Sequence, residues 1–189
     1  MAKQTGTEGD YIRRIEAYLS LPAFLAIVSS SVEVFRRETI GYLIGFKGES
    51  KFMVEHAIPY QTAESTPTHA TPDPNRVVRI NEILAELSQG FEYIGDFHSH
   101  TVYGDLPGTV LPSGTDLAFT VPGELSIICS VNFKGKSVNW RENRRGILTG
   151  TVGEYRIEIG GYYFAKAHIG SNYQRVLIKC PSLTGIHSK

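Results

Sequence analysis

The order of the secondary-structure signals constrains the fold of this chain more than any other feature of its sequence. Apolar residues at helical spacing occur in the first two thirds, whereas the part from Glu124 onward consists of apolar, strand-like runs separated by glycines. This mixed order predicts an α+β fold, with the helices early in the chain and a meander of antiparallel strands at its end.

Two segments have clear local signals. Asp73 is a good N-cap and Pro74 suits a first helical position, so a helix begins there, and Gly90 ends its apolar stripe. Residues 61–75 contain three prolines and no large apolar side chain, which predicts a long loop of the kind that is often functional. We expect further helices over residues 11–19, 33–37 and 113–121. Strands are expected over residues 23–28, 39–47, 51–60, 91–100, 124–133, 137–141, 147–152, 154–166 and 174–180.

Length, charge and cysteine content exclude several classes of protein. A chain of 189 residues can bury one stable core, so we expect a single domain. The 19 basic and 19 acidic residues balance, which disfavours a nucleic-acid partner. The sequence has no long apolar run and its start is polar, which predicts a cytoplasmic protein without a membrane segment. Cys129 and Cys180 form no CxxC pair, which excludes a disulfide framework and a cysteine-built zinc site.

The sequence His98-Ser99-His100 is the first candidate for chemistry. Residues two apart on a strand point to the same face, so both imidazoles would converge at the end of the expected strand. That placement suits two ligands of one metal ion. Histidines that are simply solvated or packed in the core are the alternative interpretation.

A carboxylate follows at the start of the next expected helix. In Ser113-Gly114-Thr115-Asp116, the serine and the acid are close to a capping box, which alone would explain both residues. The helix could also return the Asp116 carboxylate to the two imidazoles. Two histidines and one carboxylate leave a fourth tetrahedral position open, which is typical of catalytic zinc.

Two further acids could support such a centre. Glu38 stands just before an expected strand and could accept a proton, although a glutamate is more often simply exposed. Asp96 shares a face with His98 and His100. It could orient an imidazole, replace Asp116 as a ligand, or be an ordinary acid at the end of a strand.

Together these residues resemble a known motif. The chain contains E-x-x-G-x-L-x-G at residues 38–45, then H-S-H at 98–100 and P-S-x-x-D at 112–116. The combination resembles the JAMM motif of the JAB/MPN+ metalloprotease family. The resemblance implies a single JAB/MPN-like, cytidine-deaminase-like domain over residues 1–189, with a curved mixed sheet flanked by helices. Its motif-bearing core would span about residues 23–135, followed by a C-terminal β-rich extension over 136–189.

The resemblance also implies an activity, that of a zinc-dependent isopeptidase or peptidase that cleaves after the C-terminal Gly-Gly of a ubiquitin-like protein. One Zn²⁺ per chain would be bound by His98, His100 and Asp116. Glu38 would be the general acid and base, and Ser113 would help to stabilise the oxyanion. The sequence departs from the family pattern after His100, where a threonine replaces the usual proline and the loop is five residues longer.

Other functions remain open at this point. A non-catalytic scaffold or binding subunit is one alternative, because many relatives of this fold have lost the metal. A processing enzyme for a sulphur-carrier-like protein is another. Scaffold members lack one or more ligands, and here all five motif residues are present, so we favour the enzyme with a ubiquitin-like or sulphur-carrier-like protein as its partner.

Overall fold

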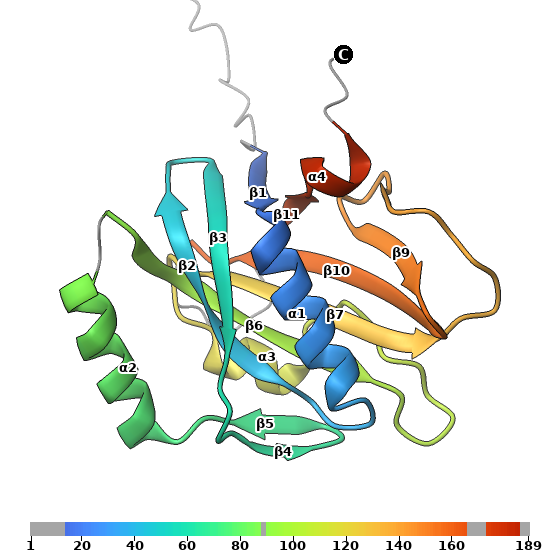
Figure 1. Ribbon diagram of the computed structural model, residues 1–189, viewed down its shortest axis with the longest axis horizontal. Coiled ribbons are helices and arrows are strands. Elements are labelled where there is room, and N and C mark those ends of the chain that lie inside the picture. The colour runs from blue at the N-terminus through green and yellow to red at the C-terminus, as the bar shows by residue number, and fades with distance from the viewer. Residues whose placement is uncertain (1–13, 88–89, 166–172, 186–189) are drawn as a thin grey trace, which may run out of the picture.

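The computed structural model describes residues 14–87, 90–165 and 173–185 and shows an α+β fold built on one large mixed sheet (Figure 1). The nine strands of this sheet are β1 (Ile15–Leu19), β2 (Ile40–Lys47), β3 (Lys51–Pro59), β6 (Glu92–Thr101), β7 (Leu125–Phe133), β8 (Arg141–Glu142), β9 (Leu148–Val152), β10 (Tyr155–Tyr163) and β11 (Gln174–Lys179). A separate hairpin pairs β4 (Glu64–Thr66) with β5 (His69–Thr71). The helices of the described part are α1 (Leu21–Glu33), α2 (Pro74–Leu87), α3 (Gly114–Phe119) and α4 (Pro181–Thr184).

The large sheet closes on itself. Its strand order is β11-β1-β3-β2-β6-β7-β10-β9-β8, and β11 also pairs with β10, so seven of the strands form a ring. Three pairs are parallel, namely β1 with β11, β1 with β3, and β6 with β7. The predicted α+β class with a curved mixed sheet is confirmed, and the closure into a barrel-like ring is a feature that the sequence did not predict.

The C-terminal strands belong to this same sheet. Along its whole length, β10 pairs with β7, while β9 and β11 pair with successive parts of its other edge. In turn, β11 lies parallel to β1. The C-terminal extension expected over residues 136–189 therefore includes two strands, β10 and β11, that complete the ring.

Helix α1 corrects the strand expected over residues 23–28. The Ser20 side chain caps the helix by accepting from the Ala23 amide at 3.1 Å, and Pro22 lies in the first turn. Apolar residues of one face of the helix are buried in the main core, among them Phe24, Ile27 and Val28, whereas Leu21 and Leu25 are exposed. A run that is apolar on most sides has no periodicity, so length and caps decide between helix and strand, and here they favour the helix.

Strand β1 corrects the helix expected over residues 11–19, of which residues 11–13 lie outside the described part. Ile15, Ala17 and Leu19 are buried while their neighbours are half-buried, a period of two that a parallel pairing with β3 and β11 explains. The short helix expected over residues 33–37 is a turn after the end of α1. The strand expected over residues 137–141 is reduced to Arg141–Glu142.

The other predicted elements are present. The expected strands over 39–47, 51–60, 91–100 and 124–133 are β2, β3, β6 and β7, and the expected helices at Pro74 and at Ser113 are α2 and α3. The expected loop over residues 61–75 contains the β4–β5 hairpin. Helix α2 has no buried residue, and Leu87 is 69% exposed. None of the described helices is long and apolar enough to cross a membrane.

Candidate metal centre

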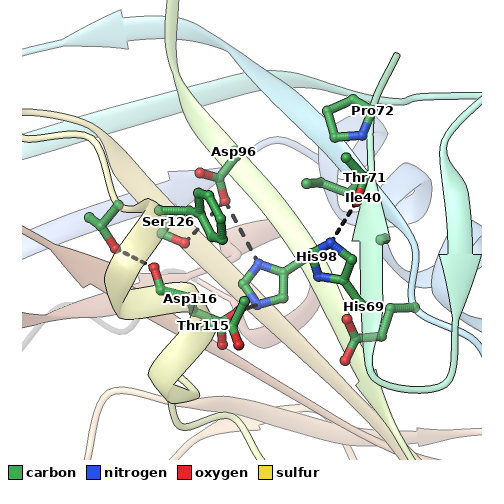
Figure 2. A pocket seen from close by; sticks show the side chains of 13 residues that line it. Ile40, His69, Thr71, Pro72, Asp96, His98, Thr115, Asp116 and Ser126 are labelled. Carbon is green, nitrogen blue, oxygen red and sulfur yellow. Dashed lines mark hydrogen bonds and ion pairs between the residues drawn. The ribbon is translucent and has the colours of Figure 1, made fainter. Parts of the chain in front are cut away.

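Three predicted ligands converge on one point above the sheet. His98 and His100 belong to β6 and Asp116 to the first turn of α3; Figure 2 shows His98 and Asp116. One Asp116 oxygen lies 3.4 Å from His98 Nε2 and the other lies 3.3 Å from His100 Nε2. One ligand atom from each residue lies within 4.8 Å of the other two. In the described part of the chain, this group alone has the composition and spacing of a metal site.

The strand pairing explains why both imidazoles share one face. Alternate residues of β6 point to opposite sides, so Phe97 lies in the main core while His98 and His100 point away from it. Ser99, between them, is fully buried, and its hydroxyl accepts from the Thr39 amide at 2.9 Å. This contact ties the segment that carries Glu38 to the strand that carries the histidines.

The second imidazole is oriented by the loop that follows it. The carbonyl oxygen of Thr109 lies 2.7 Å from His100 Nδ1, where it accepts the ring proton. His100 Nε2 is therefore the nitrogen that is left for a metal, and it is the one that faces Asp116.

Loop residues 102–113 are held in place from two sides. The Asn132 side chain accepts from the Gly108 amide at 2.8 Å and donates to the Gly108 carbonyl at 2.9 Å. Any Cβ at position 108 would lie only 2.6 Å from the His100 carbonyl oxygen, so the chain needs glycine there. The buried Tyr162 hydroxyl donates to the carbonyl of Val110. The five extra residues of this loop therefore do not loosen its contact with His100.

Thr101 occupies the position where the family motif has proline. It is buried, and its hydroxyl accepts from the Arg36 amide at 3.2 Å. Beyond it, Tyr103 and Leu106 exchange two backbone hydrogen bonds of 3.0 Å and form a tight turn. The departure from the motif thus adds a structured turn next to the centre and leaves the ligands in place.

Ser113 caps the helix that carries Asp116. The Ser113 hydroxyl accepts from the Asp116 amide at 3.2 Å, and the Ser113 amide donates to the Asp116 carboxylate at 2.6 Å. The expected capping box is present, and it fixes the carboxylate that faces the histidines. Leu117 packs against buried residues of the sheet, which anchors α3. The serine hydroxyl still has its own proton to donate.

Charge and burial act together in this cluster. Burial would raise the pKa of Asp116, but His100 and His98 outweigh it and hold that pKa far below its usual range. Burial would lower the pKa of His98, but the Asp116 and Asp96 carboxylates raise it to about 10. Both shifts show that the cluster stabilises a positive charge between the imidazoles and the carboxylate.

Glu38 lies beside the cluster, in the same cavity. Its amide donates to the Thr66 carbonyl at 2.8 Å, and its carbonyl accepts from the Ser65 hydroxyl at 2.5 Å, so the β4–β5 hairpin holds its backbone. Burial raises the pKa of Glu38 to about 7, and the nearby imidazoles of His100 and His98 reduce that rise. A carboxyl group with this pKa can both take and give a proton near neutral pH.

Asp96 lies on the other side of the first histidine. Its carboxylate is 3.8 Å from His98 Nδ1 and accepts from the Ser126 hydroxyl at 3.1 Å (Figure 2). Asp116 faces His98 Nε2. Asp96 is therefore placed to orient the imidazole, and of the two acids it is Asp116 that joins the His-His-Asp group.

The candidate site opens into a cavity of about 290 Å³. Glu38, His98 and Asp116 form part of its wall, the β5 strand and Pro72 form another part, and α3 also contributes Phe119, which is 75% exposed. An exposed aromatic ring at the rim suits contact with a substrate.

The composition and spacing of the three side chains suit one shared metal ion. Histidine nitrogens and a carboxylate oxygen are the ligands of catalytic zinc sites, and one such atom from each residue lies within 4.8 Å of the other two. In addition, His98 Nε2 is buried and faces an Asp116 oxygen at 3.4 Å without forming a well-directed hydrogen bond to any described residue. Coordination of a metal would satisfy this buried nitrogen.

Three residues with a supporting role were not singled out from the sequence. Ser99 links the Glu38 segment to β6, Thr109 orients His100 through its backbone, and Asn132 fixes the loop. A small polar residue in the middle of a buried strand was the only signal for Ser99. Thr109 and Asn132 act through contacts between distant segments, which leave no local pattern.

Comparisons with known proteins identify the family to which the chain belongs. The sequence matches the family of prokaryotic homologs of the JAB domain over residues 20–144, and the chain therefore belongs to this family. No curated protein matches the sequence. A solved structure, protein DSY2949 from Desulfitobacterium hafniense, has a similar fold, with a TM-score of 0.56 and 16% identity over 86% of this chain and 92% of that one.

Proposed function

We propose that this protein is a zinc-dependent peptidase or isopeptidase that cleaves after the C-terminal Gly-Gly of a ubiquitin-like protein. The observation that carries the proposal is the convergence of His98, His100 and Asp116 beside a cavity that His98 and Asp116 line together with Glu38, whose pKa is raised to about 7. Each of the five motif residues has a position that suits its proposed role. A sulphur-carrier-like protein with a similar tail is the other substrate that the proposal admits.

The proposed ligands are His98 Nε2, His100 Nε2 and Asp116. Zinc held by these residues would supply an acidified water and polarisation of the scissile carbonyl. Thr109 fixes the proton of His100 on Nδ1, and Asp96 is placed to do the same for His98, so each Nε2 keeps a lone pair for the metal.

Glu38 is the proposed proton carrier. Its carboxylate takes a proton from the attacking water and then gives it to the departing amine. The pKa near 7 suits both steps, because the group is partly protonated and partly ionised at neutral pH. Burial in the cavity wall is the main cause of this shift, so the cavity that receives the substrate also tunes the acid.

Ser113 is proposed to stabilise the oxyanion. Its oxygen accepts a hydrogen bond from the Asp116 amide, which leaves its hydroxyl proton free to point toward a developing negative charge. The same capping contact fixes the serine next to the metal ligand on α3.

The test combines metal analysis with cleavage. The purified protein, never exposed to chelator, is analysed for metals and then incubated with fusion proteins in which a ubiquitin-like or sulphur-carrier-like domain ends in Gly-Gly before a reporter. Cleavage by the wild type and a loss of roughly 10²–10⁴-fold in Glu38→Gln support the proposal. Glu33→Gln, at an exposed glutamate of α1, is the matched control.

Two outcomes contradict the proposal. Protein that contains zinc but cleaves none of the fusions indicates the non-catalytic binding role instead. Cleavage that is unchanged in Glu38→Gln shows that the proton is carried by another group.

A further inference from the structure

A second cavity borders the loop that orients His100. Its volume is about 550 Å³, and one wall consists of Gly108, Thr109, Val110 and Leu111. It shares no lining residue with the cavity of the metal centre. The other walls carry Arg144, Arg145 and Arg175, three positive charges around one hollow.

Backbone hydrogen bonds hold the two segments that carry these three arginines. Arg144 and Arg145 lie in the turn before β9, where the Asn143 side chain accepts from the amides of Arg145 at 2.8 Å and Ile147 at 3.1 Å. Arg175 belongs to β11. The carbonyl of Gly146 accepts from the Ile178 amide at 2.9 Å, which ties the turn to β11. The backbone therefore holds the two sources of positive charge in a fixed relation.

Their charges have no acidic partner in the part of the chain that the structure describes. Among the described residues, no acid forms an ion pair with any of the three arginines. Glu158 is the one carboxylate in the lining, and it lies 3.3 Å from the guanidinium of Arg156. Three like charges around a cavity repel one another, so the arrangement favours the binding of a negatively charged group.

We propose that this cavity docks an acidic segment of the protein on which the metal centre acts. Arginine forks bind carboxylates in pairs of parallel hydrogen bonds, which suits glutamate and aspartate side chains. All three arginines are exposed. A small-ligand pocket buries most of its ligand, whereas this open basic hollow suits a peptide segment that stays partly in water.

The location links docking to catalysis. The loop residues that line the basic cavity include Thr109, whose carbonyl orients His100. An acidic segment bound there lies one loop away from the ligands of the metal centre. Because the chain has no net charge, this local cluster supplies an attraction that the whole protein does not. The identity of the partner as the substrate rests on the proposed function, whereas the binding of acidic peptide does not.

The first experiment measures binding of a fluorescein-labelled, C-terminally amidated hexaglutamate peptide by fluorescence anisotropy. The metal-loaded wild type is expected to bind it more tightly than the hexaglutamine peptide, with an affinity that falls as salt rises. The triple variant Arg144→Ala, Arg145→Ala and Arg175→Ala is expected to lose roughly tenfold in affinity, as the loss of three exposed ion pairs implies. The triple variant keeps the residues of the metal centre. A peptide that bound only to the metal would therefore bind this variant as tightly as the wild type.

A matched control removes the same charge elsewhere. Arg37→Ala, Arg79→Ala and Lys136→Ala change three exposed cations that line neither cavity. This triple variant is expected to bind hexaglutamate like the wild type. Reversal of the cluster with Arg144→Glu, Arg145→Glu and Arg175→Glu is expected to transfer binding to a hexalysine peptide.

Three results would overturn the docking site. Equal losses of affinity in the two triple alanine variants would show a general electrostatic attraction to the protein rather than binding at this cavity. Binding of tripolyphosphate that is tighter than that of the peptide would identify a small-anion site instead. Hexaglutamate binding that is no tighter than hexaglutamine binding would show that the cavity does not recognise acids. If peptide binding depends on the cluster while no Gly-Gly fusion is cleaved, the docking site stands and the proposed function fails.

Discussion

The two flanks of the candidate site differ in how firmly they are held. On the ligand flank, Asn132 fixes Gly108, Tyr162 fixes Val110, and the capping box fixes Asp116. On the opposite flank, the β4–β5 hairpin is joined to the Glu38 backbone by two hydrogen bonds, and the following helix α2 has no buried residue. Metal ligands need fixed geometry, whereas the cavity wall opposite them can keep more freedom to adjust.

The largest effect is expected where the ligand flank is broken directly. Asp116→Ala removes one ligand, the acid that faces both imidazoles, and leaves His98 Nε2 buried without its charged neighbour. We expect loss of bound zinc and a decrease in cleavage of at least roughly a thousandfold. Metal content and initial rates measure both effects.

Asp105→Ala is the control for that prediction, because Asp105 is an exposed acid in the neighbouring loop. It should keep its zinc and its rate. An Asp116→Ala protein that retains stoichiometric zinc would assign the third ligand to another group, with Asp96 as the first alternative.

A smaller effect is expected from a change in the support of the same flank. In Gly108→Ala, the new methyl group would lie 2.6 Å from the His100 carbonyl oxygen, so the loop or β6 must move. We expect destabilisation by about 1–3 kcal/mol and weaker zinc binding. Urea unfolding and titration with a zinc chelator measure the two quantities.

Gly114→Ala is the matched control on α3, since a Cβ there meets no atom within 4 Å. It should bind zinc like the wild type. If Gly108→Ala also behaves like the wild type, the loop does not support His100 in the way that we describe.

The raised pKa of Glu38 predicts that the free energy of unfolding depends on pH. Burial raises the pKa of Glu38 to about 7 in the folded state, whereas the unfolded value is near 4.3. Between these values the folded state binds more protons than the unfolded state, so stability falls as pH rises toward 7. Glu38→Gln removes this loss and should stabilise the metal-free protein at pH 8 by about 1–2 kcal/mol, after allowance for partial exposure.

Urea unfolding of both proteins at pH 5 and pH 8, with chelator present, measures the difference. The advantage of Glu38→Gln should be present at pH 8 and clearly smaller at pH 5, because only part of the interval between the two pKa values lies below pH 5. An equal difference at both pH values would show that the folded pKa of Glu38 is not raised.

The smallest effect is expected on the opposite flank. Leu87 of α2 is 69% exposed, so Leu87→Ala should change the free energy of unfolding by less than about 0.5 kcal/mol. Ile27→Ala, at a fully buried position of α1, should cost about 2–5 kcal/mol. Unfolding of both variants in urea tests this contrast, and a large cost at Leu87 would show that α2 is packed in solution.

The sequence predicted the parts of the molecule whose signals are local. The strand over residues 91–100, the N-cap at Ser113 and the spacing of the histidines each depend on a few neighbouring residues, and the structure contains all three features. The errors share a different cause. The run that forms α1 is apolar on most sides, so its sequence has no period that distinguishes a helix from a strand. Residues 15–19 fit both the helical period and the strand period of two, so their pairing with other strands decides their conformation. The closure of β10 with β11 and the contact of Asn132 with Gly108 join distant segments, which no local pattern encodes.

The central claim is that His98, His100 and Asp116 hold one zinc ion. The most direct measurement is the zinc content of the purified protein, determined by atomic emission without any exposure to chelator. We predict about one zinc per chain in the wild type and almost none in Asp116→Ala. Wild-type protein that is folded but contains no stoichiometric zinc, and takes up none when zinc is supplied, would contradict the account.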